Sequence, residues 1–244
     1  MKLVQGLQKL NFPQTEIQRI VPLMESYINE LLLFNSAYNL VNTNDREEIA
    51  VRHILDSLSA FWQIKALANQ KAALLGQENV FIADIGSGGG LPGIPLAAAL
   101  PEFNFLLIER MSKRCAFLEN AAAILGLKNV QVKNWELEKT PAASIDIATF
   151  RAFRPLDKKM LQSLLAILRP EGILAAYKAK RQKILEEMEA LDYSEEKEGG
   201  PNCGKSAGNE NPKAFKIIPL EVPFLTNTNS GDDRERNLVV LRRK

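Results

Sequence analysis

A glycine-rich stretch, DIGSGGGLPGIP, at residues 84–95 is the first candidate for a ligand-binding site. Glycine-rich turns let the main chain come close to a nucleotide. This stretch fits two such motifs in different registers: Asp-x-Gly-x-Gly-x-Gly from Asp84, and Gly-x-Gly-x-x-Gly from Gly88. The two motifs are typical of different cofactors, so the register decides which cofactor is expected.

The position of the preceding strand favours the register that starts at Asp84. The apolar run VFIADI predicts a strand that ends at Ile85, so the ligand-binding turn begins at Gly86. The other register is the dinucleotide form, and it puts Pro92, which has no N–H, where a helix should donate amides to a pyrophosphate. The favoured register is that of S-adenosyl-L-methionine-dependent methyltransferases, and a dehydrogenase is the less favoured alternative. The predicted cofactor-binding residues of the loop are Asp84, Gly86, Gly88 and Gly90.

An acidic residue follows the loop at the distance that a nucleoside-containing cofactor requires. Glu109 ends the predicted strand FNFLLIE, about 20 residues downstream, where a carboxylate can accept hydrogen bonds from ribose hydroxyls. Short glycine motifs also match by chance, and Glu109 could be an ordinary solvated strand end. The order of strand, loop, helix and acid-tipped strand favours the cofactor site.

Two hydrophobic patterns divide the chain into a helical part and an alternating part. Up to about residue 70 the apolar residues recur at helical spacing, over 14–34 with Pro22 as a kink or break, and again over 49–67. From Val80, short apolar runs alternate with helical segments, which indicates βαβ units and a parallel sheet. We therefore expect a helical extension over 1–70 and a methyltransferase domain over 71–244 that act as one structural unit.

The predicted fold is α/β, a class I S-adenosylmethionine methyltransferase (Rossmann-like) fold with a seven-stranded, mostly parallel sheet. The expected strands are 80–85, 103–109, 129–133, 145–150, 172–178, 214–220 and 236–243, and the helices between them are 93–100, 112–125 and 156–168. The last two strands are expected to form an antiparallel hairpin at the sheet edge, because their connection is too short for a crossover helix. The polar, glycine-rich tract 194–213 is expected to be a flexible insertion.

Local signals place the ends of two of these helices. Ser112 is the expected N-cap of its helix, and Gly126 lies just beyond the end of the same helix. Gly93 is expected to let its helix pack closely, with Pro92 or Pro95 in the first turn.

Composition sets the outer limits of function. A net charge of +2 does not mark a nucleic-acid-binding protein, so any contact with RNA must come from local clusters of basic residues. The two cysteines, Cys115 and Cys203, lie far apart and outside any C-x-x-C pattern, so no disulfide and no metal site are expected. There is no signal-peptide core and no apolar stretch of about 18 residues, so we expect a cytoplasmic protein without a membrane span.

Several segments besides the glycine loop carry a more specific signal. They are FNSAYNLVNTNDREEIAVRHILDSL, FIADIGSGGGLPGIPL, KRCAFL, FRAF and the late RNLVVL. In this order they resemble the GidB/RsmG family of bacterial small-subunit ribosomal RNA guanine-N7 methyltransferases. The resemblance implies S-adenosyl-L-methionine as cofactor and 16S ribosomal RNA, or the small ribosomal subunit, as partner. We expect the protein to act as a monomer.

The resemblance also implies particular residues of the site. The family's cofactor contacts fall on Gly86, Leu91, Trp135, Glu136 and Arg151. Around NWEL the chain departs from the family pattern, which usually has an arginine where Asn134 stands.

The implied reaction needs positioning more than proton transfer. Guanine N7 has a free lone pair, so no general base must remove a proton before attack. Arg151 follows a predicted strand and thus lies at the carboxyl edge of the sheet, where ligands bind. We expect it to orient the cofactor or the target base, and a surface ion pair is the alternative.

Four residues are candidates for contact with RNA: Arg52, His53, Lys178 and Arg181. For the first two, spacing favours an ordinary helix face, with an ion pair between Arg52 and Asp56 and a histidine at the core edge. The family resemblance implies the alternative that Arg52, His53 and Asp56 join the N-terminal helices to the cofactor site or to the RNA. For Lys178 the alternative is a lysine whose stem lies along the apolar strand end.

Two other functions are compatible with the same fold. A small-molecule methyltransferase would also have the glycine loop, and a noncatalytic RNA-binding or assembly protein could keep the fold without the reaction. The intact loop and Glu109 argue against a site that has lost its cofactor.

Overall fold

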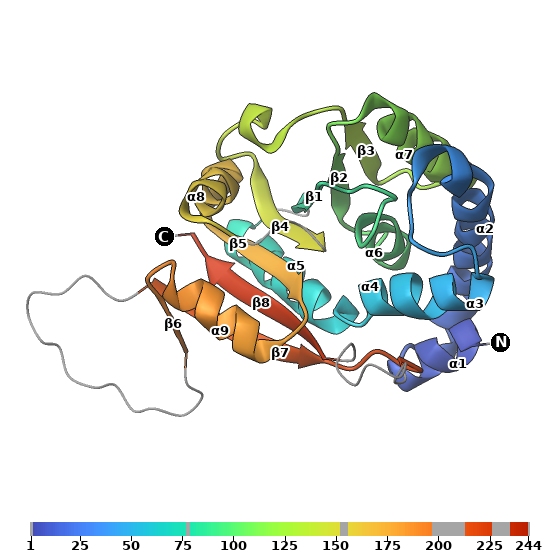
Figure 1. The fold of residues 1–244 in the computed structure, drawn as a ribbon, viewed down its shortest axis with the longest axis horizontal. Coiled ribbons are helices and arrows are strands. Elements are labelled where there is room, and N and C mark those ends of the chain that lie inside the picture. Colours follow the sequence, from blue (N-terminus) through green and yellow to red (C-terminus); the bar gives the residue numbers. More distant parts are fainter. Residues whose placement is uncertain (1, 77–78, 152–155, 197–212, 226–234, 244) are drawn as a thin grey trace, which may run out of the picture.

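The computed structural model describes residues 2–76, 79–151, 156–196, 213–225 and 235–243 (Figure 1). Its helical elements are α1 (Lys2–Lys9), α2 (Gln14–Tyr38), α3 (Arg46–Ile49), the π-helical turn η1 (Ala50–Leu55), α4 (Asp56–Leu58), α5 (Phe61–Leu75), α6 (Gly93–Ala99), α7 (Ser112–Ile124), the 3-10 turn η2 (Leu137–Lys139), α8 (Lys158–Ile167) and α9 (Arg181–Glu189). Its strands are β1 (Phe81–Ile85), β2 (Asn104–Ile108), β3 (Val130–Lys133), β4 (Ile145–Arg151), β5 (Leu168–Lys178), β6 (Tyr193–Glu195), β7 (Lys213–Leu220) and β8 (Arg236–Arg242).

All these strands belong to one sheet in the order β3-β2-β1-β4-β5-β8-β7-β6. Strands β1 to β5 are parallel to one another, and β8 is antiparallel to both β5 and β7. The central strands are buried on both faces, which explains why they appear in the sequence as continuous apolar runs. The predicted α/β class I methyltransferase fold is confirmed.

The sheet differs from the prediction at its far edge. Within the described residues it has eight strands rather than seven, because the short strand β6 pairs with β7. The antiparallel pairing of the last two strands is confirmed, but β8 lies inside the sheet, between β5 and β7. Of the predicted insertion 194–213, residues 197–212 lie outside the described residues.

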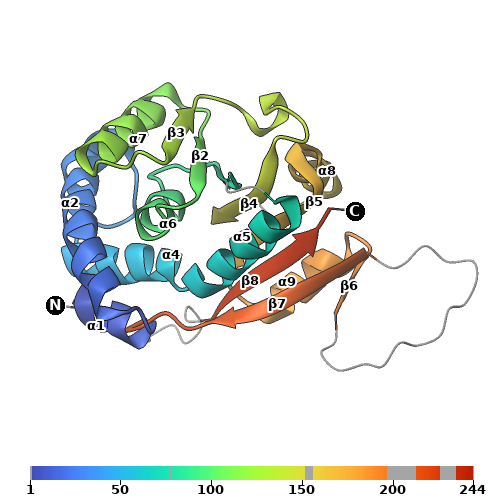
Figure 2. The same ribbon diagram turned by 180° about the vertical axis from the view of Figure 1, so that it is seen from behind.

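Helices cover both faces of the sheet and create two hydrophobic cores. The larger core joins α1 to α7 to one face, and the smaller joins α8 and α9 to the other. Helix α9 lies in front of β7 and β8 in Figure 1, and α5 lies next to β8 on the opposite face when the molecule is turned (Figure 2). The N-terminal helices share the larger core with α6, the helix that follows the glycine loop.

The N-terminal helices differ from the prediction at two places. Pro22 does not interrupt α2, because burial of Ile17, Ile20 and Met24 outweighs the cost of about 3 kcal/mol that proline brings to a helix interior. The segment 49–67 is not one helix. It passes through the π-helical turn η1, and α4 ends where the Ser59 hydroxyl and amide both donate to the Asp56 carbonyl.

The predictions for the ends of α6 and α7 are confirmed except for the N-cap of α7. Gly126 follows α7 with φ +63°, and a Cβ on Gly93 would lie 2.4 Å from Leu107, so both glycine predictions are confirmed. Pro95 lies in the first turn of α6, as predicted. Ser112 is not the N-cap of α7, since the cap is Met111 and the Ser112 hydroxyl donates to Asn134 instead.

Candidate cofactor and substrate site

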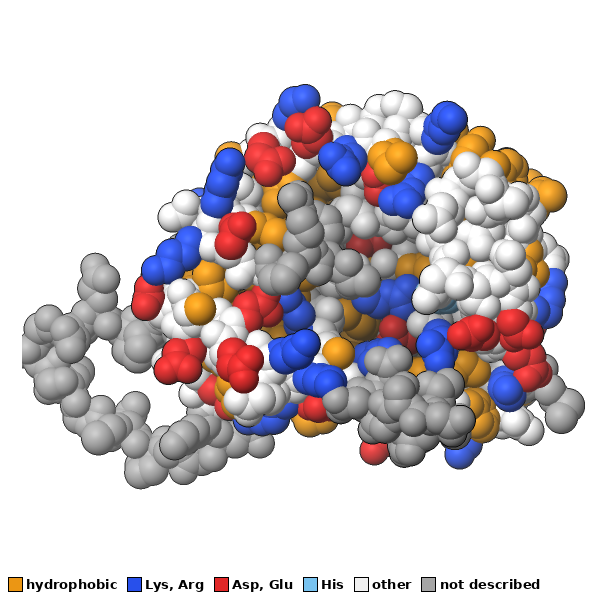
Figure 3. Space-filling model, in the orientation of Figure 1, with side chains coloured by type: hydrophobic (Ala, Val, Ile, Leu, Met, Phe, Trp, Pro, Cys, Tyr) orange, Lys and Arg blue, Asp and Glu red, His pale blue; other side chains and the backbone are white. Residues whose placement is uncertain are grey.

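A cavity of about 870 Å³ opens at the carboxyl ends of β1, β2 and β3. Its walls come from the strand ends, from the 3-10 turn η2 and from the start of α8. The lining includes Ile85, Gly86, Ile108, Glu109, Arg110, Met111, Arg114, Trp135, Glu136, Leu137, Glu138, Asp157, Lys159 and Met160. Figure 3 views a face of the molecule that is hollowed near its centre, with basic and acidic side chains mixed around the hollow.

The glycine loop begins where the sequence predicts it. Strand β1 ends at Ile85, and Gly86, Gly88 and Gly90 all have positive φ, between 57° and 90°. At Gly90 a Cβ would lie 2.6 Å from Ile94 and 2.9 Å from Leu118, so a side chain has no room. Gly86 lines the cavity, and the turn therefore presents main chain to any ligand there.

Asp84 shapes this loop from beneath and does not line the cavity. Its carboxylate is 1% exposed and accepts hydrogen bonds from the Gly93 amide (2.9 Å) and the Ser87 hydroxyl (2.8 Å). Burial raises the pKa of Asp84 to about 6, although these two donors and the nearby Arg151 guanidinium act to lower it. Asp84 thus joins both ends of the turn to the end of β1.

Glu109 lines the cavity beside the loop. One of its oxygens accepts from the Gly88 amide (2.9 Å) and the other from the Met111 amide (2.8 Å). A carboxylate has about four lone-pair positions, so each oxygen can accept one more hydrogen bond. Glu109 is therefore fixed by main chain and still able to accept from ribose hydroxyls.

The third wall follows β3. Trp135 and Glu136 line the cavity, and the Lys133 ammonium lies 5.7 Å from the centre of the Trp135 ring. Asn134 donates to the carbonyls of Glu109 (3.1 Å) and Arg110 (2.9 Å). It thus connects the ends of β2 and β3, a role that its place in NWEL gave no means of predicting.

These groups fit S-adenosyl-L-methionine. Ile85, Ile108 and Leu137 give apolar surface suited to a purine, Glu109 offers free lone pairs to the ribose, and Gly86 leaves the main chain accessible. The set contains no feature that requires a phosphate, such as a lysine donated by the loop itself.

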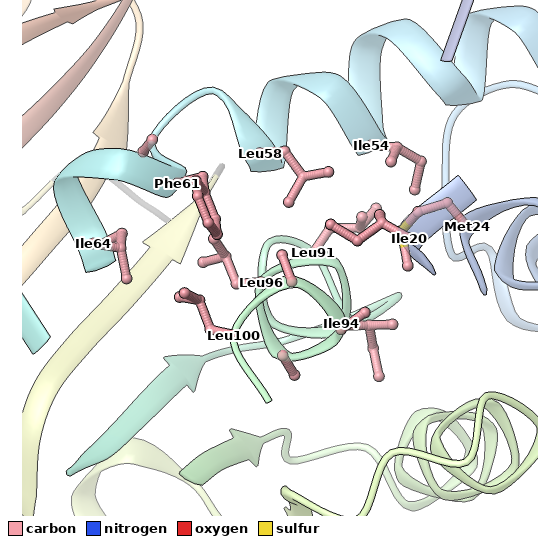
Figure 4. Packing of buried hydrophobic residues seen from close by; sticks show 14 of the residues in the cluster. Ile20, Met24, Ile54, Leu58, Phe61, Ile64, Leu91, Ile94, Leu96 and Leu100 are labelled. Carbon is pink, nitrogen blue, oxygen red and sulfur yellow. The ribbon is translucent and has the colours of Figure 1, made fainter. Parts of the chain in front are cut away.

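The N-terminal helices hold the other side of the glycine loop. Tyr27 of α2 is fully buried, and its hydroxyl donates to the Gly89 carbonyl. The Leu91 side chain points into the hydrophobic core beside Ile20 and Ile54, as Figure 4 shows, and does not line the cavity. A contact of Leu91 with the cofactor would therefore have to be made by its main chain.

Arg151 ends β4 on the same side as the N-terminal helices. Its guanidinium donates to the Asp56 carboxylate (2.7 Å) and the Arg52 carbonyl (3.1 Å), and its other terminal nitrogen lies 3.2 Å from His53 Nδ1. The predicted ion pair between Arg52 and Asp56 is wrong: Arg52 pairs with Glu48 (3.1 Å), because the π-helical turn changes the register of this face. The side chains of His53, Asp56 and Arg151 thus meet, although about 95 residues separate the helix from the strand.

Comparison with known proteins identifies the family. The family model described as "rRNA small subunit methyltransferase G" matches residues 20–204, a span that includes the glycine loop, Glu109 and Arg151. This chain belongs to the GidB family. The predicted family is confirmed.

Similar proteins of known name support the family assignment along nearly the whole chain. A "Ribosomal RNA small subunit methyltransferase G" from Treponema denticola is 38% identical over 98% of this chain and 92% of its own length. One of the same name from Hydrogenovibrio crunogenus is 36% identical over 87% of this chain and 81% of its own length. Among solved structures, a tRNA (m1A58) methyltransferase from Aquifex aeolicus matches with a TM-score of 0.50 at 12% identity, over 78% of this chain and 68% of that one. This last likeness supports the fold alone.

In this GidB family member two further RNA candidates, besides Arg52, have acidic partners. Lys178 lies 2.9 Å from both oxygens of Glu187, and its side chain is only 15% exposed. Arg181 pairs with Glu195 of β6 at 2.7 Å. Both side chains lie at the end of β5 or just beyond it, as predicted, but their charges are engaged within the protein.

Sequence reasoning missed several residues that build the site. Tyr27, Ser87 and Asn134 hold the loop and the strand ends, and Arg236 of β8 donates to Asp56 (3.2 Å). Ser87 lies in the glycine loop, Asn134 in NWEL and Arg236 in RNLVVL, but these patterns assign them no contact. Only their positions in space show their roles. Within the part of the chain that the structure describes, no helix is long and apolar enough to span a membrane.

Proposed function

We propose that this GidB family member transfers a methyl group from S-adenosyl-L-methionine to N7 of one guanine in 16S ribosomal RNA. The observation that carries the proposal is the family match, which spans the glycine loop and Glu109 beside the cavity and Arg151 at the end of β4. S-adenosyl-L-methionine, when bound, supplies a methyl group on a positively charged sulfur. The enzyme is an rRNA (guanine-N7)-methyltransferase.

The protein's own contribution is to bind and to orient. The proposed cofactor contacts are Gly86, Glu109, Trp135 and Glu136, which line the cavity. Asp84, Gly88, Gly90 and Leu91 are proposed to serve the cofactor by shaping its loop. Guanine N7 needs no deprotonation, so Arg151 is proposed to position the cofactor or the base and not to act as a base. An arginine is suited to positioning and not to acting as a general base, because the guanidinium does not lose its proton in proteins.

The helical extension 1–70 and the domain 71–244 are proposed to act as one unit. Helix α5 crosses this boundary, and the extension shares the larger core with α6. We propose that the enzyme works as a monomer in the cytoplasm on 16S RNA or the small subunit. Arg52 and His53 are proposed to face the RNA, and contacts of Lys178 and Arg181 with RNA would require their ion pairs to open.

The test is methyl transfer with mapping of the product. Purified protein is incubated with labelled S-adenosyl-L-methionine and unmodified 16S RNA, free or in small subunits, and the modified base is located by mass spectrometry. We expect 7-methylguanine at one position and almost no transfer with Gly86→Asp, whose side chain would enter the cavity. Transfer to small molecules with none to RNA would contradict the proposal and support the small-molecule alternative.

A further inference from the structure

The turn that receives Arg151 has an unusual hydrogen-bond pattern. The Asp56 amide donates to the carbonyls of Val51 and His53, and not to that of Arg52, as a regular α-helix would require. The Arg52 carbonyl instead accepts from Arg151 at 3.1 Å. Single π-helical turns inside helices occur often at functional sites, and here the turn makes one carbonyl available to a side chain from the sheet.

Two groups of this turn and the side chain of Asp56, which directly follows it, surround the guanidinium. They are the Arg52 carbonyl, the His53 ring and the Asp56 carboxylate, which we call the Arg151 socket. The side chains of Arg151 and Asp56 are 14% and 5% exposed, so their 2.7 Å ion pair is largely removed from water. His53 Nδ1 can accept from Arg151 only when the ring is neutral, and burial, with Arg151 and Arg52 nearby, lowers the pKa of His53 to about 3.

The socket is itself fixed to the sheet. Arg236 of β8 donates to the second oxygen of Asp56 at 3.2 Å. The Tyr177 hydroxyl of β5 donates to the Ser57 carbonyl at 2.7 Å, and both groups are buried. The turn is thus held against β4, β5 and β8 together, and it cannot shift without breaking contacts to each of them.

We propose that the π-helical turn η1 fixes the direction of Arg151, so that Asp56 and His53 are positioning residues that act through Arg151 in methyl transfer. The proposal rests on the function proposed above. An arginine side chain is long and loses about 2 kcal/mol of rotamer freedom when it is ordered. Contacts that order it before the substrates bind remove that cost from the reaction, and a misplacement of about 1 Å can cost roughly a hundredfold in rate.

The deciding experiment is a double-mutant cycle in the full-length protein. The variants are Asp56→Ala, Arg151→Ala and the double variant. For each, kcat and the KM of both substrates are measured at steady state, and the rate constant of methyl transfer in a single turnover, on the RNA that the wild type methylates. We expect Asp56→Ala to lower kcat by about 10- to 100-fold with the KM for S-adenosyl-L-methionine changed far less. In the Arg151→Ala background the same change should cost almost nothing, because its target is already absent.

Two further variants separate positioning from stability. Asp146→Asn is the matched control, since Asp146 is a fully buried partner of Arg169 (2.9 Å) at the opposite end of β4. It should lower the stability and leave the rate per folded molecule unchanged. Asp56→Asn keeps an oxygen that can accept from Arg151, so it should fold if Asp56→Ala does not, and it should lose less activity.

A spectroscopic measurement tests the socket independently of activity. In ¹⁵N NMR of the arginine side chains, assigned with the Arg151→Lys variant, the terminal nitrogens of Arg151 should give separate signals in the wild type and averaged signals in Asp56→Ala. Identical spectra, or losses of rate that add in the cycle, would overturn the proposal. A wild type that methylates no RNA would contradict the proposed function and leave the spectra to decide the socket.

Discussion

The two ends of strand β4 carry the same kind of ion pair and use it differently. At the amino end, Asp146 pairs with Arg169 of the adjacent strand β5 and also accepts from the Phe81 amide. At the carboxyl end, Arg151 pairs with Asp56 of the N-terminal helices. The Arg169 side chain is 34% exposed, whereas that of Arg151 is 14% exposed and has three partners in the socket.

The comparison shows that position in the sheet, and not the chemistry of the pair, gives each arginine its role. Ligands of doubly wound sheets bind at the carboxyl ends of the strands, so Arg151 lies where it can act on a substrate. Arg169 lies at the opposite edge of the sheet, away from the ligand. We therefore expect changes at the carboxyl edge to affect the reaction, and equivalent changes at the amino edge to affect stability alone.

The largest expected effect is that of removing each arginine in turn. Arg151→Ala should lower the rate of methyl transfer by about 10²- to 10³-fold, the usual cost of losing a charged or hydrogen-bonding group that orients a reaction centre. Arg169→Ala should destabilise the protein by about 2 kcal/mol, because Asp146 is left buried without its charged partner. Rates normalised to folded protein, with urea unfolding curves, measure both effects. Equal losses of rate would remove the distinction between the two edges.

Two glycines extend the comparison to the main chain. Gly90 at the carboxyl edge and Gly126 after α7 both have positive φ, 90° and 63°. Gly126→Ala should lower the stability by about 1 kcal/mol, from backbone strain alone, since no atom lies within 4 Å of the added Cβ. Ala at position 90 also overlaps Ile94 and Leu118 and should cost about 3 kcal/mol. Denaturant unfolding of both variants gives the two values, and a Gly126→Ala variant as unstable as Gly90→Ala would contradict this account.

The carboxyl edge should also respond to pH through His53. Its folded-state pKa of about 3 is below the ordinary 6.5, so the unfolded chain takes up a proton first and the folded state loses stability as the pH falls below 6.5. Relative to the wild type, His53→Asn should gain about 2 kcal/mol between pH 6.5 and 4.5, because its Oδ1 can accept from Arg151 without titrating. Urea unfolding of both proteins from pH 4.5 upward measures the difference, which should become constant above about pH 7.5.

Asp84 should change the stability with pH in the opposite direction over the same pH range. Its folded-state pKa of about 6 lies above its ordinary value of 3.8, so the stability that it contributes at low pH is lost as the pH rises toward 6. Asp84→Asn should therefore gain stability relative to the wild type between pH 4 and 6.5, whereas His53→Asn gains it in the reverse direction. The same slope in both variants would show that one of the two assignments is wrong.

The smallest expected effect concerns two single hydrogen bonds to carbonyls. Tyr27→Phe removes the donor to the Gly89 carbonyl and should cost about 1 kcal/mol, together with a few-fold loss of affinity for S-adenosyl-L-methionine. Lys71→Met removes the donor to the Glu171 carbonyl at the start of β5 and should leave that affinity unchanged. Calorimetric titration of both variants compares the two edges, and unchanged affinity in Tyr27→Phe would show that the loop does not depend on α2.

Local patterns predicted most of the fold correctly because they depend on neighbours in the sequence. The five central strands, the glycine turn after Ile85 and the close approach at Gly93 all follow from apolar runs and from residues without side chains. The predictions failed where tertiary contacts outweigh local preference. Packing carries α2 through Pro22, and the contacts of residues 52–57 with the sheet accompany a π-helical turn that no spacing rule predicts.

The sequence alone predicted the type of cofactor site, because a glycine turn between a strand and a helix, followed by a strand that ends in an acidic residue, leaves few alternatives. It predicted the family through other segments, such as FRAF and RNLVVL. Only the tertiary structure decided how that site is supported. Tyr27, Asp56 and Arg236 belong to elements far from the loop in the chain, and their contacts appear only when the N-terminal helices pack on the sheet. Side chains that meet over such distances are selected by shape and charge in the folded molecule, and that selection leaves no short-range pattern in the sequence.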